Sequence, residues 1–293
     1  MSKLRYSIKD LENFTQIKAH TIRIWEQRYG LLSPKRTDTN IRYYSEDDLK
    51  KILNINLLYT SGYKISKIAL LEEEQIIDES KSLILVSETS KQSEIDELTM
   101  LILDFKGFEI KSFLENQMVE SNLEDIYIEL ILPLLSKIGQ LWQVNSINII
   151  HEHYFSNIFK EFLISNIESL KINLDTSKSA LLFLHDYEEH EFAILVYYYI
   201  LKKNGYCCHY FGQKIPLKEI SIAFNQIKPQ LVVSTFTAKL SETKFKKIAS
   251  KLLEMSKTSK VIVSGSQVTN DNIKETSNLT HIKSIDQLRS ILN

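Results

Sequence analysis

A histidine with a carboxylate two residues before it is the arrangement in this sequence best suited to bind a metal. Glu188 and His190 follow a short apolar run that predicts a strand, and Phe192 opens a predicted helix. In an open sheet of parallel strands, ligands bind beyond the carboxyl ends of the strands. A carboxylate that accepts one imidazole N–H orients the ring, so that its other nitrogen can bind a metal. A lone histidine is more often structural, so both interpretations stay open at this point.

A second candidate constellation combines an aromatic ring with a polar pair. Trp142 is followed, after nine residues, by Glu152 and His153. The polar step at Asn145 and Ser146 predicts the end of one helix and the start of the next. Trp142 and the Glu152–His153 pair are therefore expected to approach each other across a helical hairpin. The alternative is a helical bundle that serves only for dimerisation.

The N-terminal region carries basic and aromatic residues in a pattern that predicts DNA binding. Ser7 caps a predicted helix, residues 15–20 form a turn, and residues 21–29 form a second helix, which is the geometry that places a recognition helix in the major groove. Residues 34–44 predict a two-stranded wing whose cations face phosphates. We expect Trp25 and Tyr29 to pack in the core and Glu26 to pair with an arginine of its own domain. The expected DNA-binding residues are Lys18, His20, Arg23, Arg28, Lys35, Arg36, Arg42 and Tyr43.

Charge is distributed unevenly along the 293 residues, although the net charge is only −1. Residues 1–70 hold 13 Lys/Arg against 7 Asp/Glu, residues 71–130 hold 4 against 16, and residues 131–293 hold 19 against 14. This asymmetry indicates a basic module followed by an acidic one. The domain boundaries that we expect are 1–75 for the DNA-binding domain, 76–92 for a linker, 93–175 for a helical bundle and 176–293 for an α/β domain.

The spacing of apolar residues predicts two kinds of architecture after the linker. From Ser93 to Lys171 they recur every three or four residues, which is typical of amphipathic helices in a four-helix-type bundle. Beyond Ser177, short apolar runs alternate with helical stretches, which indicates a parallel sheet covered on both faces. The predicted strands are Ala180–Leu184, Cys207–Phe211, Leu231–Ser234, Val261–Val263 and His281–Ile285.

Membrane insertion and disulfide scaffolding are both disfavoured by the sequence. The longest uninterrupted apolar run, Phe192–Leu201, has ten residues, whereas a membrane span needs roughly 18 or more. No charged and then apolar leader opens the chain. Cys207 and Cys208 are adjacent, and we expect them to be packing residues in a strand rather than a redox pair. These features predict a cytoplasmic protein.

The N-terminal motif resembles the winged helix-turn-helix of MerR-type transcription regulators. Residues 21–37 (TIRIWEQRYGLLSPKRT) and 40–45 (NIRYYS) keep the family's Arg-x-Trp-Glu core, its Arg-Tyr-Gly-Leu-Leu turn and its Arg-x-Tyr wing. Gln16 and Asn40 replace two family glycines, and Asn is well suited to positive φ. Cysteine is absent from residues 1–206, which excludes the branch of this family that senses metals through thiolates.

The rest of the chain, residues 93–293, resembles the cobalamin-binding unit of corrinoid methyltransferases and mutases. The form it is most similar to is that of cobalamin-dependent, light-responsive MerR-type regulators, with a helical bundle followed by a Rossmann-like domain. This resemblance implies that His190 is the lower axial ligand of the cobalt and that Glu188 orients it. It also implies cofactor contacts from the bundle and from the groove that takes the nucleotide tail: Trp142, Glu152, His153, Ser234, Ser264 and Gly265.

Four positions depart from the family pattern. Ala193 replaces a glycine of the axial-ligand motif, Phe236 replaces a leucine, and Ser264 replaces the first of two glycines, so each is expected to add bulk where the tail passes. Extra bulk in a close-packed groove costs about 1–3 kcal/mol. Gln143 stands where a light-sensing member carries a second axial histidine.

The leading hypothesis is a transcriptional regulator, not an enzyme. Residues 1–70 would bind a double-stranded DNA operator, and the remainder would sense cobalamin, either adenosylcobalamin or another form, with light as a second input. The cofactor would lie between bundle and Rossmann-like domain, in a homo-oligomer that family analogy makes a dimer or tetramer. The alternative is a MerR-type regulator with a degenerate cobalamin fold that binds another ligand or a protein partner. A corrinoid-dependent methyl carrier is disfavoured because a winged helix has no role in methyl transfer.

Overall fold

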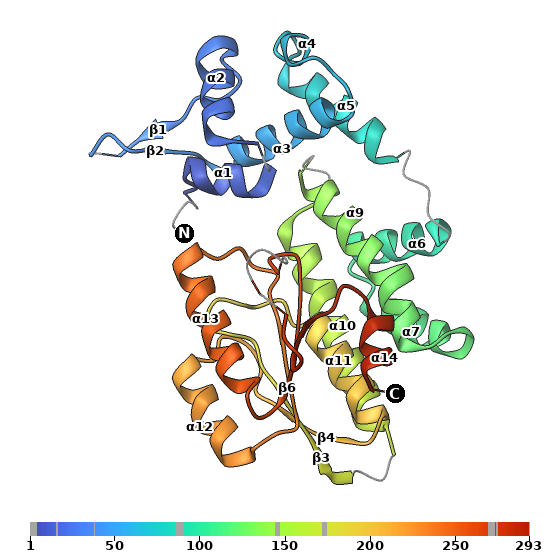
Figure 1. Ribbon diagram of the computed structural model, residues 1–293. Helices are drawn as coiled ribbons and strands as arrows, with labels where there is room; N and C mark the ends of the chain where they lie inside the picture. The colour runs from blue at the N-terminus through green and yellow to red at the C-terminus, as the bar shows by residue number, and fades with distance from the viewer. Residues whose placement is uncertain are drawn as a thin grey trace. The chain divides into compact units, whose positions relative to one another are not determined.

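The chain forms two compact units. The computed structural model in Figure 1 describes residues 5–15, 17–37, 39–85, 91–143, 147–171, 175–268, 273 and 275–292. The first unit takes in residues 1–116 and 128–156, and the second takes in residues 117–127 and 157–293. No helix in the described part of the chain is long and apolar enough to span a membrane.

The first unit begins with the predicted helix-turn-helix and wing. Ser7 caps the first helix, because its Oγ accepts from the backbone N–H of Asp10 at 3.2 Å. The wing is an antiparallel pair with Asn40 in its turn at φ +63°, so the predicted hairpin is confirmed, whereas Gln16 lies outside the described residues. The elements of this region are α1 (Ile8–Thr15), α2 (Ala19–Tyr29), β1 (Lys35–Arg36), β2 (Arg42–Tyr43), α3 (Glu46–Thr60), α4 (Ile65–Ile68) and α5 (Glu73–Leu85).

One apolar core holds these elements together. Trp25 is only 5% exposed and Tyr29 packs against the same cluster, so both were predicted correctly as core residues. Glu26 pairs with Arg42 at 3.1 Å, which confirms the predicted ion pair within the domain. The buried members are Leu11, Ile22, Trp25, Leu31, Leu32, Tyr44, Leu49, Ile52, Ile55, Leu58, Ile68 and Ile76.

Most of the expected linker, residues 76–92, is occupied by a helix. Residues 76–85 belong to α5, and Ile76 is buried in the core of the first unit. An ion pair between Lys51 and Glu73, at 3.3 Å, also joins α3 to α5. Ile76 and Leu83 pack on the core of the first unit, so this part of the expected linker belongs to that unit. Residues 86–90 lie outside the described residues.

The acidic middle of the chain is helical, as its periodicity predicts. Helix α9 ends at Gln143 and α10 begins at Ile149, so the predicted break between Trp142 and Glu152 is confirmed, although Asn145 and Ser146 lie outside the described residues. Within the first unit, α6 packs against α9. The elements are α6 (Gln92–Leu103), α7 (Gly107–Glu120), α8 (Leu123–Asp125), the π-helical segment η1 (Ile126–Ile131), α9 (Leu132–Gln143) and α10 (Ile149–Ser169).

The second unit is built on a five-stranded sheet in which every pairing is parallel. Helices α12 and α13 lie on one side of the sheet, and α11 and α14 on the other (Figure 1). The fifth strand lies two residues earlier than predicted, and Ile285 starts a helix. The elements are β3 (Asp175–Leu182), α11 (Phe192–Lys203), β4 (Tyr206–Tyr210), α12 (Leu217–Ile227), β5 (Leu231–Thr235), α13 (Glu242–Met255), β6 (Lys260–Ser264), β7 (Leu279–His281) and α14 (Ile285–Leu292).

The strand order determines where a ligand can bind. The order is β4-β3-β5-β6-β7, so the chain first moves from β3 to β4 on one side and then crosses to β5 on the other. The loops after β3 and β5 therefore diverge and leave a crevice at the carboxyl ends of the strands, the usual ligand position in such sheets. All five residues of β5 are buried, as a strand covered on both faces requires.

Gly265 occupies a position in the second unit that admits no side chain. Its φ is +110°, and a Cβ there would lie 2.3 Å from the carbonyl oxygen of Phe236. Gly212, in the same unit, has a φ of +80° but open space around it. A Gly212→Ala change is expected to destabilise by about 1–2 kcal/mol through backbone strain alone. A Gly265→Ala change is expected to lose a further 1–3 kcal/mol or so, because atoms must shift.

Urea unfolding of the full chain, followed by circular dichroism, measures the difference between these two variants. Since both glycines lie in the same unit, the same transition reports both changes. Equal losses of unfolding free energy for the two variants would contradict the close contact between Gly265 and Phe236.

Candidate functional site

Glu188 and His190 form a hydrogen-bonded pair in the crevice between β3 and β5. His190 Nδ1 lies 2.6 Å from Glu188 Oε1. The Glu188 side chain is fully buried, whereas that of His190 is 63% exposed. The other carboxylate oxygen of Glu188 accepts the backbone N–H groups of Thr237 and Ala238, at 2.6 and 2.8 Å, in the loop after β5. The predicted pair is thus formed, and its carboxylate joins the two loops that flank the switch point of the sheet.

The carboxylate of Glu188 is held in its charged form. Burial alone would raise the pKa of Glu188, but hydrogen bonds from the His190 ring and from the backbone N–H groups of His190, Ala238 and Thr237 lower this pKa to about 2. An anion at this point accepts the proton on Nδ1 and so favours the tautomer in which Nε2 carries the lone pair. This is the form of imidazole that binds a metal through Nε2.

Buried hydroxyl groups lie at the ends of the neighbouring strands. Ser234 and Thr235, at the end of β5, are fully buried, and neither hydroxyl oxygen has a hydrogen-bond partner among the described residues. Ser264, at the end of β6, accepts a hydrogen bond from the Tyr197 hydroxyl at 3.0 Å. Buried polar atoms are nearly always paired in folded proteins. The two unpaired hydroxyls therefore mark a position where a bound molecule can supply partners.

A cavity opens beside the end of β6. Its volume is about 410 Å³, and it is lined by Tyr197, Ser264, Gly265, Val268 and His281 together with three further residues. The absence of a side chain at Gly265 lets backbone atoms approach Phe236 closely. The cavity and the hydroxyl groups of β5 both lie at the carboxyl ends of strands, where the family resemblance implies that the nucleotide tail of a cobalamin binds.

The residues present fit a cobalamin with one axial histidine. His190 offers an oriented imidazole, Ser234 offers an unpaired hydroxyl, and Gly265 keeps the groove free of a side chain. The expected effect of Phe236 on this groove stays a prediction. The Phe236 side chain is fully buried in the sheet's apolar core, with its ring centroid 4.8 Å from that of His185 and 5.4 Å from that of Phe245.

The residues of the expected cofactor cap belong to the first unit. Glu152 and His153 lie in the first turns of α10, with Glu152 Oε2 at 3.1 Å from His153 Nδ1. Glu152 also accepts a hydrogen bond from the Ser156 hydroxyl at 2.6 Å. Trp142 packs against the apolar core around α3, and Lys50 Nζ lies 4.8 Å from its ring centroid. The Glu188–His190 pair belongs to the second unit.

Exposed cations mark one side of α2. Ile22 and Trp25 are buried, whereas His20, Arg23 and Arg28 are exposed. At 100° per residue, His20 and Arg23 lie opposite the buried face, as a recognition helix requires. Arg28 lies on a flank of the helix, with its guanidinium 5.4 Å from the ring centroid of Tyr29. Lys18, which is exposed at the start of α2, pairs with Glu12 at 3.5 Å.

The wing presents its cations in two different ways. Lys35 and Arg36 are exposed, and the guanidinium of Arg36 donates to Asn40 Oδ1 at 2.7 Å, across the turn. Arg42 is partly buried, because its Nε donates to Glu26. This contact ties the wing to α2 and makes Arg42 a positioning residue as well as a candidate contact. Tyr43 lies beneath the guanidinium of Arg5, 4.7 Å from its ring centroid.

Comparison with known families supports the two functional regions. Residues 6–75 match the MerR HTH family regulatory protein, and residues 94–164 match the B12 binding domain. The chain joins a MerR-type helix-turn-helix region to a B12 binding domain. Cobalamin, the cofactor expected from the sequence, is supported by this match, and the combination is that of a transcriptional regulator.

Two transcriptional repressors match this chain over most of its length. The HTH-type transcriptional repressors CarH and CarA of Myxococcus xanthus are homologous, each 22% identical, over 249 and 263 residues. The matches cover 83% and 88% of this chain, and 82% and 85% of the relatives. The monomethylamine corrinoid protein of Methanosarcina barkeri shares the fold, with a TM-score of 0.55 at 15% identity, over 69% of this chain and 98% of its own.

Several groups that shape the site carry no signal in the sequence. Thr237 and Ala238 act through backbone N–H groups, which every residue type other than proline has. His185 is fully buried, and its Nε2 has no hydrogen-bond partner in the part of the chain that the structure describes. Only its place at a strand end could have drawn attention to it. Tyr197 lies on α11 and reaches Ser264, 67 residues away in sequence. None of these contacts follows from local spacing.

The charge on Glu188 makes an acid-dependent contribution to stability. Its pKa falls from 4.5 to about 2 in the folded state. Because the folded state binds this proton less tightly than the unfolded chain, the contribution is complete above pH 4.5 and is lost as the pH falls through about 2. A Glu188→Gln change is expected to lose about 1–3 kcal/mol at pH 7, because buried donors lose a charged acceptor. The variant's stability should also fall less steeply in acid.

Urea unfolding at pH values from 7 down to 3 measures both effects. Glu189→Gln is the matched control, since the Glu189 side chain is 64% exposed and pairs with Lys214. We expect this control to stay within about 0.5 kcal/mol of the native chain. The same acid dependence in the Glu188→Gln variant as in the native chain would refute the assignment.

Proposed function

We propose that this chain is a cobalamin-responsive DNA-binding regulator of transcription. The observation that carries the proposal is the Glu188–His190 pair at the switch point of a parallel sheet, in the same chain as a MerR-type winged helix. A carboxylate-oriented imidazole is suited to bind a metal, and the winged helix is suited to bind DNA. The similarity of this chain to the transcriptional repressors CarH and CarA, over 83% and 88% of its length, supports the DNA-binding part of the proposal.

In this proposal His190 would bind the cobalt and Glu188 would fix the orientation of its imidazole ring. Ser234, Ser264 and Gly265 would hold the nucleotide tail, and Trp142, Glu152 and His153 would contribute the cap. When bound, cobalamin would supply a metal centre that carries an exchangeable group. The functional divisions are residues 1–75 for DNA binding, 93–175 for the cap and 176–293 for the axial ligand and tail.

Cobalamin regulates DNA binding in this proposal by shifting a conformational equilibrium. A ligand that binds one arrangement of the sensor more tightly increases the population of that arrangement. In a homo-oligomer, this changes the spacing of the DNA-binding heads and hence the affinity for an operator. We base the proposal on ligand binding rather than on light, because the side-chain amide of Gln143 is bound to Asn54 at 2.9 Å.

A second candidate function keeps the DNA-binding head but assigns a different ligand to the sheet. The bond from Tyr197 to Ser264 favours it, since a phenol already occupies one hydroxyl that the tail would use. A regulator of this kind responds to another small molecule or to a protein partner. Its regulation of transcription would be unchanged by removal of His190.

Adenosylcobalamin added to the purified full chain in the dark tests the cofactor. After desalting, the native chain is expected to retain the visible absorption band of the corrinoid. A His190→Ala variant is expected to retain at most about a tenth of this band, because the bond from the imidazole to the cobalt is removed. His209→Ala, a change in β4, is the control and should retain the band. Absence of the band from native protein that is folded by circular dichroism would refute cobalamin binding.

DNA binding is tested on a duplex that the full chain selects from a random-sequence pool. Replacing Arg23 by Ala is expected to raise the dissociation constant about 10-fold and lower the salt slope by about 1, if the guanidinium contacts phosphate. The control is Lys67→Ala, which removes an exposed cation of α4. Fluorescence anisotropy at several salt concentrations measures both. Equal effects of the two changes would contradict the assignment of α2 as the recognition helix.

A further inference from the structure

The end of α9 packs against the DNA-binding head within the first unit. Helix α9 contacts both α3 and α5. Trp142, in the last turn of α9, packs against the apolar core of the head. Lys50 of α3 places its ammonium group 4.8 Å from the centroid of the indole ring. The ring electrons attract a cation placed over an aromatic face, and the attraction is stronger where water is excluded.

A second contact joins the same two helices through a pair of amides. Gln143 Nε2 donates to Asn54 Oδ1 at 2.9 Å, and Asn54 Nδ2 donates to the backbone oxygen of Gln143 at 3.3 Å. Asn54 is only 2% exposed, although it lies on α3 among buried apolar residues. A buried amide that loses its partner is left unsatisfied. The contact with Gln143 is therefore specific to this packing of α9.

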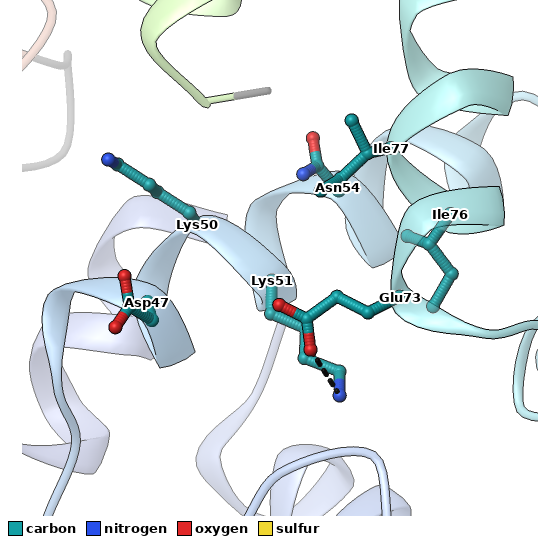
Figure 2. A pocket seen from close by; sticks show the side chains of 7 residues that line it. All are labelled: Asp47, Lys50, Lys51, Asn54, Glu73, Ile76 and Ile77. Carbon is teal, nitrogen blue, oxygen red and sulfur yellow. Dashed lines mark hydrogen bonds and ion pairs between the residues drawn. The ribbon is translucent and has the colours of Figure 1, made fainter. Parts of the chain in front are cut away.

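The cavity beside Asn54 in the head is small. Figure 2 shows Asn54 and Ile77 close together on α3 and α5, with the Lys51–Glu73 ion pair at the same junction. The cavity between these helices has a volume of about 20 Å³, enough for about one water molecule. Gln143 is thus the group that satisfies Asn54 from outside the head.

We propose that Trp142 and Gln143 form a latch between the sensor and the DNA-binding head. The latch is closed when Trp142 lies on Lys50 and Gln143 pairs with Asn54. A ligand that draws the indole onto its own surface competes with Lys50 and the head's core for the same side chain, and so opens the latch. The identity of that ligand as cobalamin rests on the proposed function above, whereas the coupling between α9 and α3 does not.

The closed latch restrains the head through a short connection. Gln143 and Trp142 are adjacent in the last turn of α9, so a displacement of this turn moves both contacts. Asn54 and Lys50 are one helical turn apart on α3, so both contacts act on the same face of that helix. Gln143 thereby has a structural role in this chain, at the position where light-sensing members of the family carry a histidine. Opening the latch frees α3, and with it the packed helix α2, to change its position relative to α9.

Hydrogen exchange of the ligand-free full chain, followed by mass spectrometry, tests the coupling. Gln143→Ala and Asn54→Ala are each expected to increase the opening of α3 and of the last turns of α9 about 5-fold, in the range found for directly coupled residues. The double variant should open no further than the more affected single variant. Gln143 lies at a helix end and is only partly buried, so its variant is expected to fold even if Asn54→Ala does not.

Lys51→Ala is the matched control, because Lys51 pairs with Glu73 of α5. It is expected to leave the exchange of α9 unchanged. If Gln143→Ala also leaves α3 and α9 unchanged, or if its effect and that of Asn54→Ala simply add, the latch is refuted whatever the ligand.

Adenosylcobalamin, added in the dark, then tests the switch. In the native chain it is expected to increase exchange of α3 and the end of α9 to the level of the Gln143→Ala variant, with no further increase in that variant. Retained corrinoid absorption without this change refutes the opening of the latch by cobalamin and leaves the proposed function standing. Absence of retained corrinoid, together with coupled exchange in the variants, refutes the proposed cofactor and leaves the coupling of α9 to α3 standing.

Discussion

The second unit depends on one buried negative charge. Both oxygens of Glu188 are used: one accepts from the His190 ring and from the backbone N–H groups of Glu189 and His190, and the other accepts from Thr237 and Ala238. Removing a carboxylate from water is unfavourable, and only such a set of donors offsets that loss. The same charge therefore closes the loop after β3 onto the loop after β5 and fixes the imidazole. Because fold and site share this group, the site cannot be loosened without loosening the sheet.

The residues that could be predicted from sequence are those whose partners are near in the chain. Glu188 and His190 are two positions apart, and the wing turn at Asn40 is equally local, so spacing and residue type were sufficient. The alternation of apolar runs and helical stretches also predicted the parallel sheet, because strands buried on both faces need nearly continuous apolar residues. Strand order and the backbone donors of Thr237 and Ala238 could not be predicted, since they depend on how distant segments cross.

Phe236 shows why a motif position predicts volume better than direction. The family pattern has a leucine at this position, so the sequence correctly predicts a larger side chain. In the structure the chain leaves β5 at Thr235, and the ring of Phe236 turns into the core among residues of β3 and α13. Tyr197 is the opposite case. It lies on α11 outside the family motifs, and its hydroxyl group reaches Ser264. Each outcome depends on the side chains around the position.

The contact between α9 and α3 is suited to switching because it is weak. A cation–aromatic contact and an amide pair each stabilise by about 1 kcal/mol, whereas a ligand with micromolar affinity supplies about 8 kcal/mol on binding. A small part of that binding free energy is enough to open both contacts, provided the ligand binds the open state more tightly. An apolar contact of the same area would bind α9 more tightly. Because apolar contacts are not directional, however, α9 could then pack on α3 in more than one position. The buried Asn54 thus makes the contact less stable than an apolar residue would, but it defines a single closed position. Because its hydrogen bond to Gln143 is weak, the contact can open reversibly.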